Sequence, residues 1–272
     1  MYGTQAAAAQ NFSQDSESEF RRLVAEGRYA YFNEEYEKAK TLLRAARELD
    51  PDNPETHEHL SLVILFELKK ELGIEGDGTL NDVKRLKPYA DNVTQFESEI
   101  RTGEELADAI LDKHPEDQRA LFVRERLRLN LIMFRRQIQD TLGGLLGEYR
   151  KAKPVIDQIV LRNPNDCRAL VTQSRINYEI GSRPWYEKLG LRAIGVRGDK
   201  EMGIQGTAKA ASMVCPDHFD SVEARFSFLS ILAKEKKWHA ASAMALELSL
   251  EFPKNTKIKY YLDLARSKTK IP

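Results

Sequence analysis

Arginine pairs seven residues apart are the clearest candidates in this chain for binding a charged group. The three pairs are Arg21 with Arg28, Arg119 with Arg126, and Arg168 with Arg175. Positions seven apart lie on one face of an α-helix. Guanidinium groups bind carboxylates or phosphates through parallel hydrogen bonds. The pairs therefore predict sites for an acidic group, unless acidic residues of neighbouring helices or solvent already satisfy them.

Other residue types give little sign of reaction chemistry. His57 and His59 are two apart and so point to different faces of a helix, and the chain contains no His-Glu-x-x-His sequence, phosphate-binding loop or nucleophile elbow. The sequence predicts no metal site, no cofactor and no enzymatic activity.

The two cysteines, Cys167 and Cys215, each lie beside a predicted repeat boundary. Two cysteines are too few for a disulfide framework or a zinc cluster. Whether they pair with one another stays open from the sequence alone.

Charge and hydropathy exclude several classes of protein. The chain has 42 basic and 42 acidic residues, which argues against nucleic-acid binding because that function usually shows a basic excess. No apolar run approaches the roughly 18 residues of a membrane-spanning helix, so we expect a soluble protein. The compartment stays open: we expect a cytoplasmic protein, or a periplasmic or exported one if a signal was trimmed near the small-residue segment Gln5–Gln10.

Prolines divide the chain into helical segments. Each of five prolines follows an apolar periodic run and precedes a short polar pair: Pro51, Pro115, Pro164, Pro216 and Pro253. Proline ends a helix, and an Asp or Asn just after it can cap the next one. This pattern predicts an all-α repeat fold. Residues 1–15 are small and polar and are predicted to be disordered, and residues 16–272 form one predicted domain.

One segment resembles a known repeat. Gly27, Tyr36, Ala39, Leu43, Ala46 and Pro51 have the spacing of the tetratricopeptide repeat, over the stretch Phe20 to Asn53. The resemblance implies antiparallel helix pairs stacked into a right-handed superhelix. We expect about five pairs, an inserted helical segment around residues 183–213, and a capping helix at residues 256–267.

The same resemblance suggests where a partner would bind. In a standard array the second and ninth positions of each first helix face the concave wall, where the six arginines would then lie. Four aromatic residues are expected on or near that wall: Tyr31, Phe66, Phe122 and Tyr178. The expected function is a non-enzymatic scaffold that holds an extended or acidic segment of a protein or peptide partner. The oligomeric state stays open.

A second segment combines several glycines with a proline and a tryptophan. Its characteristic residues are Pro184, Trp185, Lys188, Gly195, Gly198, Asp199 and Gly203. Pro184 suits a first helical turn, Trp185 offers a face for docking, Gly195 and Gly198 permit a reversal, and Asp199 can cap the next helix. Gly203 would allow close approach of another helix.

This segment is similar to one in bacterial tetratricopeptide proteins of unassigned role. A similar segment occurs in eukaryotic repeat proteins linked to lipid-droplet-assisted clearance of inclusion bodies. That resemblance, with the apolar stretch Leu60–Phe66, suggests an alternative function as a lipid- or membrane-associated adaptor.

Overall fold

The computed structural model describes residues 3–74, 78–80, 82–139 and 145–269, and within these ranges every regular element is helical. The all-α prediction is therefore confirmed. The helices are α1 (Gly3–Phe32), α2 (Tyr36–Leu49), α3 (Glu55–Glu71), α4 (Ala90–Lys113), α5 (Gln118–Phe134), α6 (Leu145–Arg162), α7 (Cys167–Gly181), α8 (Trp185–Ala193), α9 (Lys200–Ser212), α10 (His218–Lys234), α11 (Trp238–Glu251) and α12 (Thr256–Thr269). A 3₁₀ helix, η1 (Val83–Tyr89), precedes α4, and a short π-helix, η2 (Arg135–Gln139), follows α5. The expected break at Gly143 and Gly144 lies outside the described residues.

Each of the five prolines lies between two helices, and a polar side chain beside it caps the helix that follows. Asp117 Oδ1 accepts a hydrogen bond from Ala120 N at 2.9 Å, and Asp166 Oδ1 accepts one from Ala169 N at 2.9 Å. Equivalent bonds run from Glu55 N to Asn53, from Phe219 N to Asp217 and from Ile258 N to Asn255. These bonds satisfy backbone amides that a helix start leaves free. The predicted boundaries between helices are thus confirmed.

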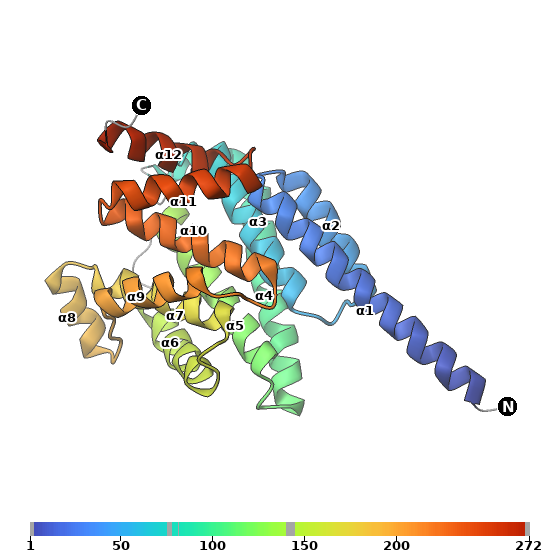
Figure 1. Ribbon diagram of the computed structural model, residues 1–272. Helices are drawn as coiled ribbons and strands as arrows, with labels where there is room; N and C mark the ends of the chain where they lie inside the picture. Colours follow the sequence, from blue (N-terminus) through green and yellow to red (C-terminus); the bar gives the residue numbers. More distant parts are fainter. Residues whose placement is uncertain (1–2, 75–77, 81, 140–144, 270–272) are drawn as a thin grey trace.

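The first helix begins earlier than the sequence predicts. Residues 1–15 are expected to be disordered, but α1 starts at Gly3 and runs unbroken into its packed half. Four consecutive alanines, Ala6–Ala9, have the highest helix propensity and favour extension of a helix that is already nucleated. Figure 1 shows this end of α1 projecting beyond the other helices.

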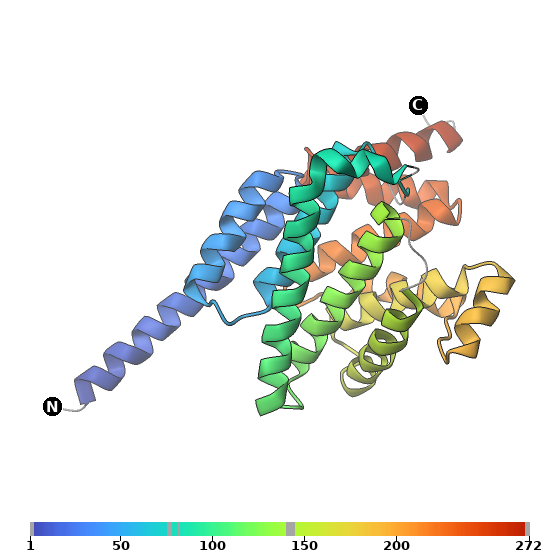
Figure 2. The same cartoon turned by 180° about the vertical axis from the view of Figure 1, so that it is seen from behind.

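Consecutive helices pack as neighbours along the chain. Contacts join α1 with α2, α3 with α4, α5 with α6, α7 with α9, and α11 with both α10 and α12. α4 also packs on α5, on the side of the molecule seen in Figure 2. Each described helix is too short or too polar to cross a membrane.

The two ends of the array meet. α1 contacts α10, and Phe32 of α1 belongs to the same buried cluster as Val222 and Phe252. Asn255 Nδ2 donates a hydrogen bond to the Phe32 carbonyl at 2.7 Å, and the Glu34 carboxylate accepts one from Thr256 N at 2.7 Å. The expected groove is open along its length, whereas these contacts close the array around its centre. The right-handed superhelix stays a prediction.

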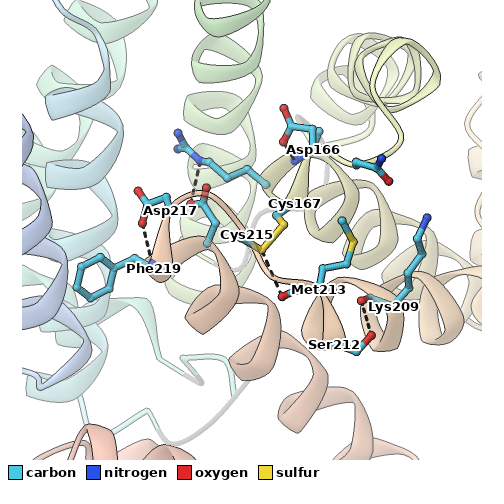
Figure 3. Close-up of a disulfide and its surroundings, with 12 residues drawn as sticks. Asp166, Cys167, Lys209, Ser212, Met213, Cys215, Asp217 and Phe219 are labelled. Carbon is cyan, nitrogen blue, oxygen red and sulfur yellow. Dashed lines mark hydrogen bonds and ion pairs between the residues drawn. A yellow bond between two sulfur atoms is a disulfide. The ribbon is translucent and has the colours of Figure 1, made fainter.

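The cysteines left open by the sequence are joined. Cys167, the first residue of α7, forms a disulfide with Cys215, which precedes α10, and Figure 3 shows the bond at this junction. Both residues are buried. The linkage holds the start of α7 against the chain that enters α10, and it closes a loop that contains α8 and α9.

Candidate binding pocket at the centre of the array

A pocket of about 170 Å³ lies where the first helices of the successive pairs converge. Its walls come mainly from α1, α3, α5, α7 and α10, with additional residues from α2, α6 and α12. Six of the ten predicted groove residues line this pocket. They are Arg28, Tyr31, Phe66, Arg126, Arg175 and Tyr178. Phe122 is buried in the core, with the Arg168 guanidinium 4.9 Å from its ring centre. The pocket lining does not include Arg21, Arg119, Phe122 or Arg168.

Charged residues at one register position meet beside the pocket. Four charged residues each lie four positions after one of the five prolines that separate the helices: Glu55, Arg119, Arg168 and Asp220. Arg119 and Arg168 both pair with Glu55, the latter at 3.3 Å, and Arg168 also lies 3.6 Å from Asp220. Carboxylates of other helices therefore lie between the arginines that were predicted to face the groove.

Arg126 is held by acidic residues on two other helices. Its guanidinium contacts Glu58 of α3 at 3.1 Å and Glu223 of α10 at 2.7 Å. Burial opposes the charge on Arg126, but Glu223 and Glu58 outweigh that effect and raise the pKa of Arg126. This arginine connects three helices and has little capacity left for a ligand.

Glu223 occupies the centre of the arginine cluster. Burial alone would raise the pKa of its carboxyl group, but Arg126, Arg175 and other nearby guanidiniums lower it to about 2. Glu55 and Glu58 respond in the same direction, because His59 and the arginines outweigh the burial that disfavours their charged forms and lower the pKa of each. Asp220 differs, because burial dominates there and raises its pKa.

The charges of this cluster balance. Five arginines form ion pairs with five carboxylates: Arg28, Arg119, Arg126, Arg168 and Arg175 with Glu55, Glu58, Asp217, Asp220 and Glu223. The sixth predicted arginine, Arg21, is exposed on α1 and pairs with Glu17 at 2.5 Å. Of the two possibilities raised by the sequence, pairing with acidic residues of neighbouring helices describes most of these arginines.

Arg175 retains the most capacity to bind a ligand. Its side chain is 34% exposed, it lines the pocket, and its one ion pair in the described residues is a long contact of 3.6 Å to Glu223. Tyr31 of α1 also lines the pocket, and its hydroxyl makes no hydrogen bond to a described residue. Burial, with Glu223 next, raises the pKa of Tyr31, so the hydroxyl remains a neutral donor.

A second polar group lines the pocket near α6. Glu179 accepts a hydrogen bond from the Tyr149 hydroxyl at 3.0 Å and pairs with Arg136 at 3.2 Å. Burial opposes the charge of Glu179, but Arg136 and Arg175 lower its pKa. Tyr178 donates to Glu235 at 2.7 Å. These contacts fix the aromatic side chains that form this wall.

The apolar stretch cited for a membrane role is part of the core. Leu60, Ile64 and Leu65 have no exposed surface. Leu62 and Phe66 of this stretch line the pocket, where the Phe66 ring meets Tyr31 edge-on at 5.7 Å between centroids. Residues Leu60–Phe66 therefore give no surface for lipid.

The glycine-containing segment forms the junction of α7, α8 and α9. Asp199 caps α9 by accepting from Met202 N at 3.0 Å, and Gly195 adopts a φ of +82° at the end of α8. A Cβ on Gly203 would lie 2.4 Å from Tyr178 N, so this glycine permits close packing of α9 on α7.

Three other residues of this segment have specific positions. Gly198 packs on Ile180 of α7, where a Cβ would approach within 2.4 Å. Pro184 precedes the first residue of α8, and Lys188 Nζ donates to the Gly181 carbonyl at 3.4 Å. Trp185 does not dock, because 71% of its surface is exposed. It is the first residue of α8, directly after the break between α7 and α8.

The spacing of Asp220 and Glu223 from Pro216 is a sequence signal for acidic residues near the pocket that the prediction did not use. Asp220 has the same separation from Pro216 as Arg168 has from Pro164, and Glu223 the same as Glu58 from Pro51. Extending the register to the fifth pair would have placed Asp220 at the second position, on the inner wall, whereas Glu223 lies between the second and ninth positions. The histidines give no additional site: His57 Nδ1 lies 2.7 Å from Glu99, and His59 lies beside Glu55 and Glu58.

Comparison with known proteins does not assign a family. No protein-family model matches the chain, and no curated protein matches it either.

Proposed function

We propose that this protein is a non-enzymatic binding protein of tetratricopeptide-like architecture that takes an acidic group of a partner protein into its central pocket. The observation that carries the proposal is the position of Arg175 on the pocket wall. Its guanidinium has one long ion pair and an exposed edge, and charged hydrogen bonds from arginine to a carboxylate are among the stronger polar contacts.

Neighbouring groups suit the same ligand. Tyr31 lines the same pocket as Arg175, and its hydroxyl is available to a ligand. A phenol donates well to a carboxylate oxygen. The rings of Tyr31 and Phe66 provide an apolar surface for the part of the ligand next to its acidic group. A side chain or a chain end that combines a carboxylate with apolar atoms fits this arrangement.

The dimensions favour a short insertion over a long bound segment. The pocket holds about 170 Å³, which is below the roughly 300–1,000 Å³ of pockets for drug-sized ligands. Contacts between α1, α10 and α12 close the array, so an extended peptide has no open channel to follow. The partner would therefore insert one acidic group, with the remainder of its chain outside.

The test selects binders from displayed short peptides of random sequence and then compares variants. Wild-type protein should enrich peptides that contain Asp, Glu or a free terminal carboxylate near an apolar residue. Arg175→Gln should weaken the selected peptides at least about tenfold, the loss expected for one charged hydrogen bond. Arg175 is a better target than Arg126, because removal of the buried Arg126 would take the closest ion-pair partner from Glu223 and one of two guanidinium partners from Glu58.

The matched control is Arg21→Gln, because Arg21 is exposed on α1 and outside the pocket. It should leave peptide affinity unchanged. Selection of peptides without acidic groups, or equal binding by wild type and Arg175→Gln, would contradict the proposed function.

A further inference from the structure

α8 presents large apolar side chains to solvent. Trp185 is 71% exposed, Tyr186 60% and Leu189 53%. Met202, at the start of the neighbouring α9, is 57% exposed. Single exposed apolar residues are ordinary, but a contiguous group on one short helix marks an interaction surface.

The apolar face of α8 is distinct from the face that holds the helix in place. Leu191 is buried, and Ile194 packs with it in the core of α5, α6 and α7. Trp185 and Leu189 lie one turn apart on the other side. The nine-residue helix is thus fixed by one face and leaves an aromatic and aliphatic face outward.

Cations lie next to this face without internal partners. Arg192 follows Leu189 by one turn and Arg197 follows α8, and both are exposed and form no ion pair with a described residue. Two of the nearby acids are already engaged, since Glu187 pairs with Arg183 at 2.8 Å and Asp199 caps α9. The exposed carboxylate of Glu201 is the remaining anion beside Met202. The patch is therefore apolar with a small positive excess.

The patch protrudes from the molecule. Figures 1 and 2 both show α8 at the periphery, on the side away from α1. A groove would suit a helix of a partner, whereas a projecting turn that carries Trp, Tyr and Leu beside arginine suits a planar surface. Tryptophan and tyrosine favour the membrane–water interface, and arginine is attracted to anionic headgroups.

We propose that α8 attaches the protein peripherally to a membrane surface that contains anionic lipids. Trp185, Tyr186 and Leu189 enter the interfacial region, and Arg192 and Arg197 contact the headgroups. Interfacial attachment of this kind needs no spanning helix. This inference is independent of the central pocket, to which α8 contributes no lining residue.

The support of α8 is rigid enough to present the patch. Gly198 and Gly203 bring the chain after α8 into direct contact with α7. The Cys167–Cys215 disulfide, with a sequence separation of 48, closes the loop that contains the helix. Insertion of the apolar side chains therefore requires little ordering of the backbone.

The experiment measures co-sedimentation of the purified full chain with vesicles. One set contains phosphatidylcholine alone, and the other contains phosphatidylcholine with phosphatidylglycerol. We expect partition onto the anionic vesicles and much less onto the neutral ones. Trp185→Ser with Leu189→Ser should reduce the partition coefficient at least about tenfold, and Arg192→Glu with Arg197→Glu should reduce it by a similar factor.

Leu246→Ser with Leu250→Ser is the matched control. These leucines are exposed on α11, Leu250 at 80%, and belong to a different surface. The control variant should partition as the wild type does. A Trp238→Phe background leaves Trp185 as the one tryptophan, whose emission should shift to the blue on anionic vesicles.

Three results would overturn the proposal. They are absence of partition on both vesicle types, equal partition on neutral and anionic vesicles, and equal loss in the α8 and α11 variants. Partition onto anionic vesicles with unchanged Trp185 emission would also contradict the proposal, because α8 would then not enter the interface. The exposed face of α8 would in that case suit a protein partner. Circular dichroism on each variant confirms that the helices are intact.

Discussion

Arg28 and Asp220 are 192 residues apart in the sequence and are joined by a hydrogen bond of 2.7 Å. The same guanidinium contacts Asp217 at 2.6 Å and lies 5.4 Å from the ring centre of Phe219. Only 6% of the Arg28 side chain is exposed. One buried arginine of the first helix therefore binds the start of the tenth, and this contact closes the array at the level of the pocket.

Replacing Arg28 with methionine should destabilise the protein through its buried partner. Asp220 would keep only Arg168, at 3.6 Å, while its carboxylate stays inside the fold. Loss of one member of a buried ion pair costs about 3–5 kcal/mol. We expect a decrease of about 3 kcal/mol in the free energy of unfolding, measured by urea denaturation, because solvent can reach Asp217.

Arg22→Met is the control for that variant. Arg22 also pairs with two carboxylates, Glu19 and Glu26, but all three side chains are exposed on α1. Exposed pairs contribute little to stability, so the urea midpoint should stay unchanged. An equal midpoint for both arginine variants would show that the closure at Arg28 does not stabilise the fold.

The helix boundaries could be predicted because their causes are local. Pro164 and Asp166 act on backbone groups within three residues, through a missing amide and a cap at 2.9 Å. Closure of the array has no such local signal. It depends on Arg28 meeting Asp220 and on Phe32 meeting Phe252, and both contacts require the curvature accumulated over all the helix pairs.

The residues of the pocket could be predicted only in part, because sequence register is local and contacts between distant helices are not. Register alone placed Arg126 and Arg175 on the inner wall, and both line the pocket. Register alone could not show that Glu58 and Glu223 come within hydrogen-bonding distance of Arg126, because these helices are neighbours in space and not in sequence. The availability of each arginine therefore required the structure.

The disulfide gives a second test of stability. Cross-linking removes conformational freedom from the unfolded chain, and for a separation of 48 residues this contributes about 2–4 kcal/mol. Cys167→Ser with Cys215→Ser should lower the free energy of unfolding by that amount and lower Tm. Thermal denaturation with and without a dithiol reductant measures the effect.

The reductant itself provides the control for this prediction. The reduced wild type should have the same Tm as the double serine variant, and the reductant should not change the Tm of that variant. Titration of free thiols in the unreduced, unfolded protein should detect none. Two free thiols in that sample would contradict the linkage.

Acid should lower the free energy of unfolding through protonation of Glu223. The pKa of this carboxyl is about 2 in the folded protein against an ordinary value of 4.5, so the unfolded chain binds its proton first as pH falls. The stabilisation is complete above about pH 4.5 and is lost between there and pH 2. At 1.36 kcal/mol for each pKa unit, it amounts to about 3 kcal/mol. Asp220, whose pKa is raised, acts in the opposite direction and partly offsets the loss.

Comparison with Glu223→Gln isolates this contribution. The variant lacks the titrating group, so its free energy of unfolding should depend less on pH between 4.5 and 2. The stability difference between wild type and variant should be largest near neutral pH and shrink toward pH 2. Parallel curves over the whole range would exclude Glu223 as a source of acid sensitivity.

Gly203 tests the junction that supports both the pocket wall and α8. A Cβ at this position would lie 2.4 Å from Tyr178 N and 2.6 Å from Tyr178 Cα, so α9 could accommodate alanine only by moving away from α7. We expect Gly203→Ala to destabilise the protein by about 1–3 kcal/mol, the usual cost of overpacking. Gly190→Ala is the matched change, because Gly190 lies in α8 with no atom near the position of a Cβ.

Both substitutions remove the same freedom from the unfolded chain, so their difference reports on the folded state. Alanine at Gly190 should be neutral or should stabilise the helix by up to about 1 kcal/mol. Because Tyr178 lines the pocket, Gly203→Ala should also weaken the selected acidic peptides, while Gly190→Ala should leave their affinity unchanged. If both variants unfold at the same denaturant concentration, close packing of α9 on the Tyr178 backbone does not stabilise this junction.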